Sequence, residues 1–134
     1  MADIIKAGVF PIKNKKVLVV RKRGHDFYIS LGGKNEPGEN DKTCLEREVH
    51  EELRCGIANL EHLATFEGPV HDDRTKTIRM ACYLGDLVGE PQLNPEDKII
   101  EYRWIGRNYA QEGIKIAHLM EFYVIPNLIK QHLL

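Results

Sequence analysis

The chain has 134 residues, of which 43% are hydrophobic, so it is long enough for one domain with a core and short for two. A formal net charge of -1 excludes a broad electrostatic attraction to nucleic acid or to an anionic membrane, and any phosphate recognition must be local. Three cysteines without C-x-x-C spacing (Cys44, Cys55 and Cys82) argue against a disulfide framework and a cysteine zinc site. The first 16 residues lack the basic start and the apolar length of an export signal or membrane span. We expect a single domain over residues 1–134 in the reducing cytoplasm.

The first third of the sequence predicts strands. Residues 4–12 and 16–23 are rich in branched apolar residues and are separated by a short polar turn, which predicts a β-hairpin. A short apolar segment follows over residues 27–31. The pattern then breaks at Gly32-Gly33, and residues 34–40 have the composition of a loop.

The next segment, residues 41–53, predicts an amphipathic helix. Its apolar residues Leu45, Val49 and Leu53 recur every four positions and form one stripe. Asp41 stands where an N-cap residue is expected. This helix separates the first strands from those that follow.

The remaining chain alternates strand and helix patterns. Three further strands are expected over residues 57–68, 77–87 and 98–106, with a polar loop between the first two. Residues 114–134 have helical periodicity, and Pro126 should end or kink one helix and can occupy the first turn of another. Strands on both sides of one helix, with a helix at the end, predict an α/β layered domain.

Four glutamates, Glu46, Glu48, Glu51 and Glu52, lie in the predicted helix. At roughly 100° per residue, the last three fall within one arc of about 100° beside the apolar stripe, where like charges weaken an isolated helix. A solvated acidic face is the usual explanation of such a run. These carboxylates border the core, however, and follow a Gly-Gly loop that carries Glu39. Convergent hard oxygen donors are what Mg²⁺ or Mn²⁺ requires, so a divalent site is the better interpretation.

The spacing resembles the Nudix box, G-x5-E-x7-R-E-U-x-E-E-x-G-U, in which U is a bulky aliphatic residue. The residues in register are Gly33, Glu39, Arg47, Glu48, Val49, Glu51 and Glu52, within a box over residues 33–55. The end of the pattern departs, because Arg54 and Cys55 replace the final G-U and Gly56-Ile57 supplies it two residues late. That shift predicts a helix that ends slightly further on.

The resemblance implies the Nudix fold, an α/β/α sandwich around a mixed β-sheet. It also implies metal-dependent hydrolysis of a pyrophosphate linkage in a nucleoside diphosphate joined to a further group, with Mg²⁺ or Mn²⁺ as cofactor. Carried over by position, Glu48, Glu51 and Glu52 are the expected metal ligands, together with the carbonyl of Gly32. Arg47 is expected to hold Glu39 or Glu48 in place through paired hydrogen bonds.

The resemblance does not assign the general base. Glu48 or Glu52 are candidates, and so are Glu96, Asp97 and Glu101 in the segment that leads into the last strand. Glu101 is equally consistent with a solvent-facing strand residue.

Substrate contacts are expected near the end of the second strand. Arg21, Lys22 and Arg23 are candidates for phosphate binding, although a basic strand end is more often only solvated. Phe27 is a candidate for stacking on a base, although such an aromatic is more often core.

The small size resembles the MutT-type enzymes, which favours a nucleoside triphosphate or an oxidised nucleotide as substrate. Pro69, downstream of the box, leaves an ADP-ribose or nucleotide-sugar pyrophosphatase as an alternative. A non-catalytic nucleotide-binding module is the second alternative. The expected partner is a small-molecule nucleotide, with no nucleic acid and no membrane, and homodimer formation is left open.

Overall fold

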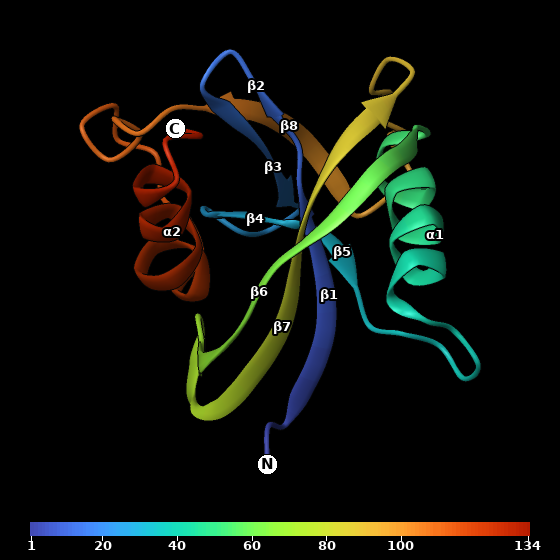
Figure 1. The fold of residues 1–134 in the computed structure, drawn as a ribbon, viewed down its shortest axis with the longest axis horizontal. Coiled ribbons are helices and arrows are strands. Elements are labelled where there is room, and N and C mark those ends of the chain that lie inside the picture. Colours follow the sequence, from blue (N-terminus) through green and yellow to red (C-terminus); the bar gives the residue numbers. More distant parts are fainter.

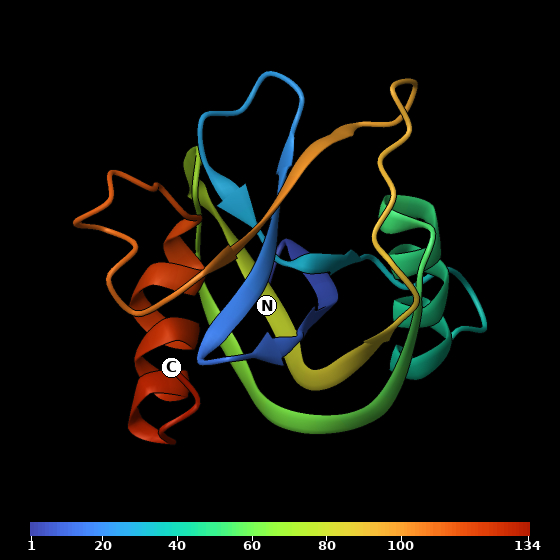
Figure 2. The ribbon, with the colours of Figure 1, turned by 90° about the horizontal axis from the view of Figure 1, so that it is seen from above.

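A computed structural model describes residues 1–134 and contains two four-stranded sheets with helices on opposite sides (Figure 1). The elements are β1 (Ile4–Phe10), β2 (Ile12–Lys13), β3 (Lys16–Lys22), β4 (Tyr28–Ile29), β5 (Leu31–Gly33), α1 (Asp41–Leu53), β6 (Gly56–Val70), β7 (Asp73–Val88), β8 (Ile99–Ile105), a π-helical turn (Met120–Val124) and α2 (Ile125–Lys130). Seen from above in Figure 2, α1 and the C-terminal helix flank the strands. The predicted α/β/α arrangement is confirmed.

The strands form two sheets where the sequence predicts one. The first has the order β5-β1-β7-β6 and is mixed, because β1 is parallel to β7 while its other pairs are antiparallel. The second is antiparallel, and in it β3 pairs with β2, β4 and β8. The predicted long hairpin of residues 4–12 with 16–23 is therefore wrong. Pro11 has no N–H for a ladder and separates β1 from β2, so only β2 pairs back on β3.

Strand β3 contributes to two hydrophobic cores. Val17 and Val19 pack in the core that includes the C-terminal helix, with Met120 and Leu128 among its members. Leu18 and Val20 point the other way, into the core beneath α1. All four valine and leucine side chains are fully buried, because alternate residues of a strand face opposite sides and both sides of this strand are covered.

Helix α1 has the predicted bounds, and the stripe of Leu45, Val49 and Leu53 is fully buried. The N-cap is Asn40, not Asp41: the Asn40 side chain accepts a hydrogen bond from the Thr43 N–H at 2.9 Å. Asp41 begins the helix instead, and its carboxylate accepts a hydrogen bond from the Tyr83 hydroxyl at 2.6 Å.

The other end of α1 corrects a second prediction. The helix ends at Leu53, and Arg54 adopts the left-handed conformation with φ 57° and ψ 29°. The Arg54 N–H donates to the His50 carbonyl at 2.9 Å, as a helix-terminating residue does. Arg54 therefore takes the place of the box glycine directly, and the helix does not extend to Gly56.

The later strands and the C-terminal helix follow the predictions in order and type; β6 and β7 are longer than predicted, whereas β8 and the C-terminal helical segment are shorter. The β6–β7 hairpin turns tightly at His71 and Asp72, so most of the expected polar loop is strand. Pro126 lies in the first turn of α2, directly after the π-helical turn, as the sequence predicts. None of the helices combines the length and apolar character needed to cross a membrane.

Candidate active site

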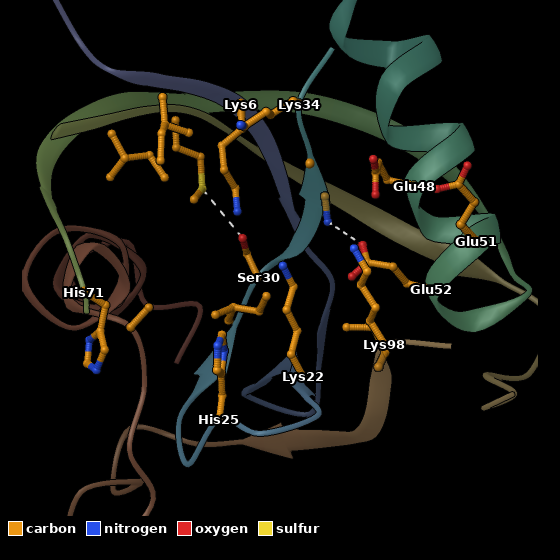
Figure 3. Close-up of a pocket in the computed structure, with 18 of the residues that line it drawn as sticks. Lys6, Lys22, His25, Ser30, Lys34, Glu48, Glu51, Glu52, His71 and Lys98 are labelled. Atoms are coloured by element: carbon orange, nitrogen blue, oxygen red, sulfur yellow. Dashed lines mark hydrogen bonds between the residues drawn. The ribbon is translucent and has the colours of Figure 1, made fainter. Parts of the chain in front are cut away.

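A cleft of about 990 Å³ lies beside α1 and β5. Its volume is at the upper end of the range usual for small-molecule sites. Figure 3 shows Glu48, Glu51 and Glu52 on the α1 side with Lys98 drawn beside Glu52, Lys6 and Lys22 around Ser30 near the middle, and His25 and His71 further away. The cleft is therefore acidic at one end, basic in the centre and aromatic at the other end.

The two glycines of β5 allow α1 to lie close to the sheet. Gly32 has φ +134°, and a Cβ at this position would lie 2.1 Å from the Ala7 carbonyl oxygen, so no other residue fits. A Cβ on Gly33 would lie 2.5 Å from the Glu48 carboxyl carbon. The Gly32 N–H donates to Glu52 Oε1 at 2.9 Å. The Gly-Gly pair thus gives space to one helix carboxylate and a hydrogen bond to another.

Glu52 is a buried carboxylate without a cationic partner. Only 9% of the residue is exposed, and its one hydrogen bond from the protein comes from Gly32. Burial raises the pKa of Glu52 to about 8, and the nearby Glu48 carboxylate adds to the rise. Burial also raises the pKa of Glu48. A cation bound beside Glu48 and Glu52 would stabilise the charged form of both carboxylates.

Arg47 is the opposite case, because its guanidinium is surrounded by acceptors. It donates to both oxygens of Glu39, from Nε at 2.8 Å and from Nη2 at 2.9 Å, which is bidentate geometry. It also reaches Glu48 Oε1 at 3.0 Å and the Lys34 carbonyl at 3.1 Å. The paired hydrogen bonds from Arg47, followed by one from the Glu36 N–H, lower the pKa of Glu39 to about 2. Arg47 thereby ties the loop before α1 to the helix.

The three predicted metal ligands differ in exposure. Glu52 is buried, the Glu48 side chain is mostly covered, and the Glu51 side chain is 55% exposed. As they stand, no three His, Cys, Asp or Glu side chains are grouped closely enough to hold a metal ion. The donor chemistry nevertheless fits Mg²⁺ or Mn²⁺, because hard carboxylate oxygens of raised pKa line the cleft beside Gly32. The ligand roles of these residues stay predictions.

The candidate bases in and just before β8 differ in position relative to the cleft. The Glu101 carboxylate accepts hydrogen bonds from the Tyr28 hydroxyl at 2.7 Å and from Arg21 Nε at 2.8 Å, which lower its pKa. Neither Glu101 nor Glu96 lines the cleft, whereas Asp97 does and pairs with Arg54 at 3.0 Å. The roles of Glu96 and Glu101 as bases stay predictions without support from position, and the role of Asp97, which lines the cleft, also stays a prediction.

Some of the predicted substrate contacts line the cleft and others do not. Arg21 bonds Glu101 and the His25 carbonyl, Arg23 bonds the Pro95 carbonyl at 2.9 Å, and neither lines the cleft. Phe27 does line it, but its ring is stacked against the His25 ring, with 4.7 Å between centroids, and contacts the tilted ring of His71, with 4.0 Å between centroids. Two imidazoles that close leave little of the Phe27 ring for a base.

Among the lysines of the cleft, Lys22 is a predicted phosphate contact, whereas Lys6, Lys34 and Lys98 are not predicted from the sequence. Lys6, Lys22, Lys34 and Lys98 all line the cleft. Strand alternation offered a signal for Lys22, because it follows Leu18 and Val20 in the sequence pattern, and these two lie on the α1 side. Lys6 offered none, since its place depends on β1 joining a sheet that the sequence did not predict.

Comparison with known families decides the identity of this architecture. The family model of the NUDIX domain matches residues 4–121. The chain belongs to the Nudix family. The Nudix chain is 30% identical over 102 residues to the NAD-capped RNA hydrolase NudC of Pseudomonas aeruginosa, a match that covers 72% of this chain and 34% of that protein. The chain thus spans about a third of the length of that curated relative.

Solved Nudix structures share the fold at low sequence identity. The E. coli ORF135 protein superposes with a TM-score of 0.74 at 20% identity, covering 98% of this chain and 92% of that one. The NUDIX domain of Shewanella oneidensis NrtR, solved with ADP ribose, gives a TM-score of 0.74 at 15% identity, covering 98% and 90%. The MutT NUDIX hydrolase of Burkholderia pseudomallei gives 0.66 at 19% identity, covering 78% and 84%. These likenesses establish the Nudix fold of the chain.

Proposed function

We propose that this Nudix protein is a metal-dependent hydrolase that cleaves a pyrophosphate linkage in a nucleotide derivative, with a nucleoside triphosphate or an oxidised nucleotide as its substrate. One observation carries the proposal: the buried Glu52 carboxylate, unpaired with any cation, faces a cleft large enough for a nucleotide. Family membership and the hydrolases among the relatives support an enzyme over a binding module.

In this proposal Glu48, Glu51 and Glu52 hold Mg²⁺ or Mn²⁺, with the carbonyl of Gly32 as a further oxygen donor. The ion, when bound, neutralises phosphate charge and lowers the pKa of water for attack on phosphorus. Arg47 fixes the Glu48 carboxylate and the loop that bears Glu39 through the hydrogen bonds described above. The helix thereby presents its carboxylates to the cleft in one orientation.

A second substrate class is favoured by the comparisons. The relatives include a hydrolase of NAD-capped RNA and a NUDIX domain bound to ADP ribose, so a dinucleotide or ADP-ribose pyrophosphatase is the alternative. The net charge of -1 gives no broad attraction to an RNA chain, which favours the small-molecule part of such a substrate.

A substrate panel tests the proposal. Nucleoside triphosphates, oxidised nucleotides, ADP-ribose, NAD, nucleotide sugars, dinucleoside polyphosphates and NAD-capped RNA should be incubated with Mg²⁺ and with Mn²⁺, and the products should be separated by chromatography. Release of phosphate or pyrophosphate reports triphosphate hydrolysis, whereas ADP-ribose, NAD and nucleotide sugars split into two monophosphates and release neither. We expect turnover of a nucleoside triphosphate and its loss in excess EDTA. Full activity in EDTA would contradict the metal role, and binding without any turnover would identify a non-catalytic module.

A further inference from the structure

The lysines in the centre of the cleft have no part in the proposed chemistry. Lys6 comes from β1, Lys22 from the end of β3, and both line the cleft with Lys34 and Lys98. No salt bridge and no side-chain hydrogen bond within the protein involves any of the four ammonium groups. The only cleft arginines are already engaged, Arg47 by Glu39 and Arg54 by Asp97. The uncompensated positive charge of the cleft is therefore on its lysines.

Lys6 and Lys22 lie around a buried hydroxyl. Figure 3 shows the two lysine side chains reaching into the cleft from different strands and ending near Ser30. Ser30 is 1% exposed, and its hydroxyl bonds only Met80 Sδ at 3.7 Å. A thioether is a weak acceptor, so this buried hydroxyl lacks a strong partner. A buried polar group without a good partner is unfavourable unless a ligand supplies one.

The lysine pair is also unfavourable on its own. Burial lowers the pKa of Lys6, and the positive charge of Lys22 lowers it further. Glu48 and Glu52 attract Lys6 from a distance, but neither pairs with it in the structure. Two like charges beside a hydroxyl whose only partner is a weak thioether acceptor form a site that an anion would stabilise.

We propose that Lys6, Lys22 and Ser30 form an anion subsite that binds a phosphoryl group of the substrate other than those held through the α1 carboxylates. The inference rests on the proposed function and narrows its substrate class. A nucleoside triphosphate has a third phosphoryl group to fill the subsite. In ADP-ribose and NAD the diphosphate is flanked on both sides by uncharged ribose, so they have none. The subsite therefore selects the triphosphate class.

Binding without metal tests the subsite separately from hydrolysis. Inorganic tripolyphosphate should be titrated by calorimetry into the wild-type protein in EDTA, and into Lys6→Gln, Lys22→Gln and the double variant. The matched control is Lys13→Gln, which removes the same charge from an exposed lysine outside the cleft. We expect each single cleft variant to bind about tenfold more weakly or worse, the double variant to bind immeasurably, and the control to bind like wild type. Wild-type affinity in the double variant, or no binding by the wild type, would overturn the subsite.

Kinetics with Mg²⁺ test the substrate class. Lys22→Gln should raise KM for a nucleoside triphosphate about tenfold and leave KM for ADP-ribose unchanged, whereas equal effects on both would refute triphosphate selection. If tripolyphosphate binds as expected but no nucleotide is hydrolysed, the proposed function fails and the subsite stands. Melting temperatures check that the variants fold, and removal of one of two like charges should not lower them. Lys6→Met serves as a second variant, because methionine removes the charge and keeps most of the apolar stem of the lysine side chain.

Discussion

The Arg47 guanidinium contacts carboxylate or carbonyl oxygens on every side, whereas Glu52, Lys6 and Lys22, in the same cleft, have no partner of opposite charge. The first arrangement is complete in the free protein and joins the loop before α1 to the helix. The second is incomplete, and each of its charges is stabilised only when a ligand arrives. In this cleft the compensated guanidinium of Arg47 therefore serves as a structural connection, and the uncompensated groups of Glu52, Lys6 and Lys22 indicate where a ligand binds.

The largest effect is expected from Glu52→Gln, which keeps the shape of the side chain and removes its ability to carry charge. Activity should fall by about a hundredfold or more, because metal affinity and neutralisation of phosphate charge are lost together. Stability without metal should hold or rise, since burial and then the nearby Glu48 carboxylate disfavour the charged form of Glu52, which glutamine cannot adopt. Steady-state kinetics and thermal melting in EDTA check the two effects. The control is Glu46→Gln, which removes a charge on the exposed side of the same helix. Nearly full activity of Glu52→Gln would show that Glu52 is a structural residue.

The next largest effect is expected from divalent ions, which should stabilise the folded protein. Mg²⁺ or Mn²⁺ should stabilise the native state by about 2.7 kcal/mol at a hundredfold excess over the dissociation constant, because the unfolded chain offers no assembled carboxylates. Thermal melting with and without the ion measures this shift. The shift should shrink strongly in Glu52→Gln and persist in Glu46→Gln. An unchanged melting temperature in the wild type at millimolar ion would leave the acidic residues as a solvated face.

Arg47→Lys tests the compensated region. Lysine keeps the positive charge but cannot make the paired bonds to Glu39 while also reaching Glu48 and the Lys34 carbonyl. We expect a melting temperature lower by roughly 2–5 °C, in contrast to the unchanged or raised value of Glu52→Gln. Activity should fall by about tenfold through loss of carboxylate orientation. A fully stable variant would mean that this network contributes little to the fold.

The smallest expected effect is at the end of α1. Arg54 has a left-handed backbone that favours glycine, so Arg54→Gly should relieve about 1 kcal/mol of conformational strain and lose only a few tenths from the ion pair with Asp97. Chemical denaturation should give a slightly more stable protein. Arg54→Ala loses the same ion pair and keeps the strain, so it should be less stable than Arg54→Gly; equal stability of the two variants would show that the conformation is not strained.

Local features of this fold were predictable and long-range pairings were not. The helix over residues 41–53 was predicted correctly because its apolar spacing and box residues are local signals. The predicted partner of β1 is wrong, because no local sequence pattern indicates that β7, some seventy residues later, lies parallel to it.

The candidate site divides in the same way. Glu48, Glu51 and Glu52 lie within five residues of one helix, so their common face follows from geometry alone. Lys6, Lys22 and Ser30 come from three segments, and only the folded sheets bring them together. Of the three basic candidates at the end of β3, only Lys22 lines the cleft; Arg21 and Arg23 do not.

The two-sided burial of β3 has a consequence for how the molecule opens. Val17 and Val19 of β3 pack in the core of the C-terminal helix, and Leu18 and Val20 pack in the core beneath α1. Neither core can therefore unfold separately while β3 stays paired in its sheet. Backbone amides of Val17 to Val20 should consequently be among the slowest in the chain to exchange with deuterium, and their exchange should report the global unfolding free energy. Local fluctuations of the loops at either end of the cleft would leave the backbone hydrogen bonds of β3 intact. Substrate entry therefore does not require either hydrophobic core to unfold.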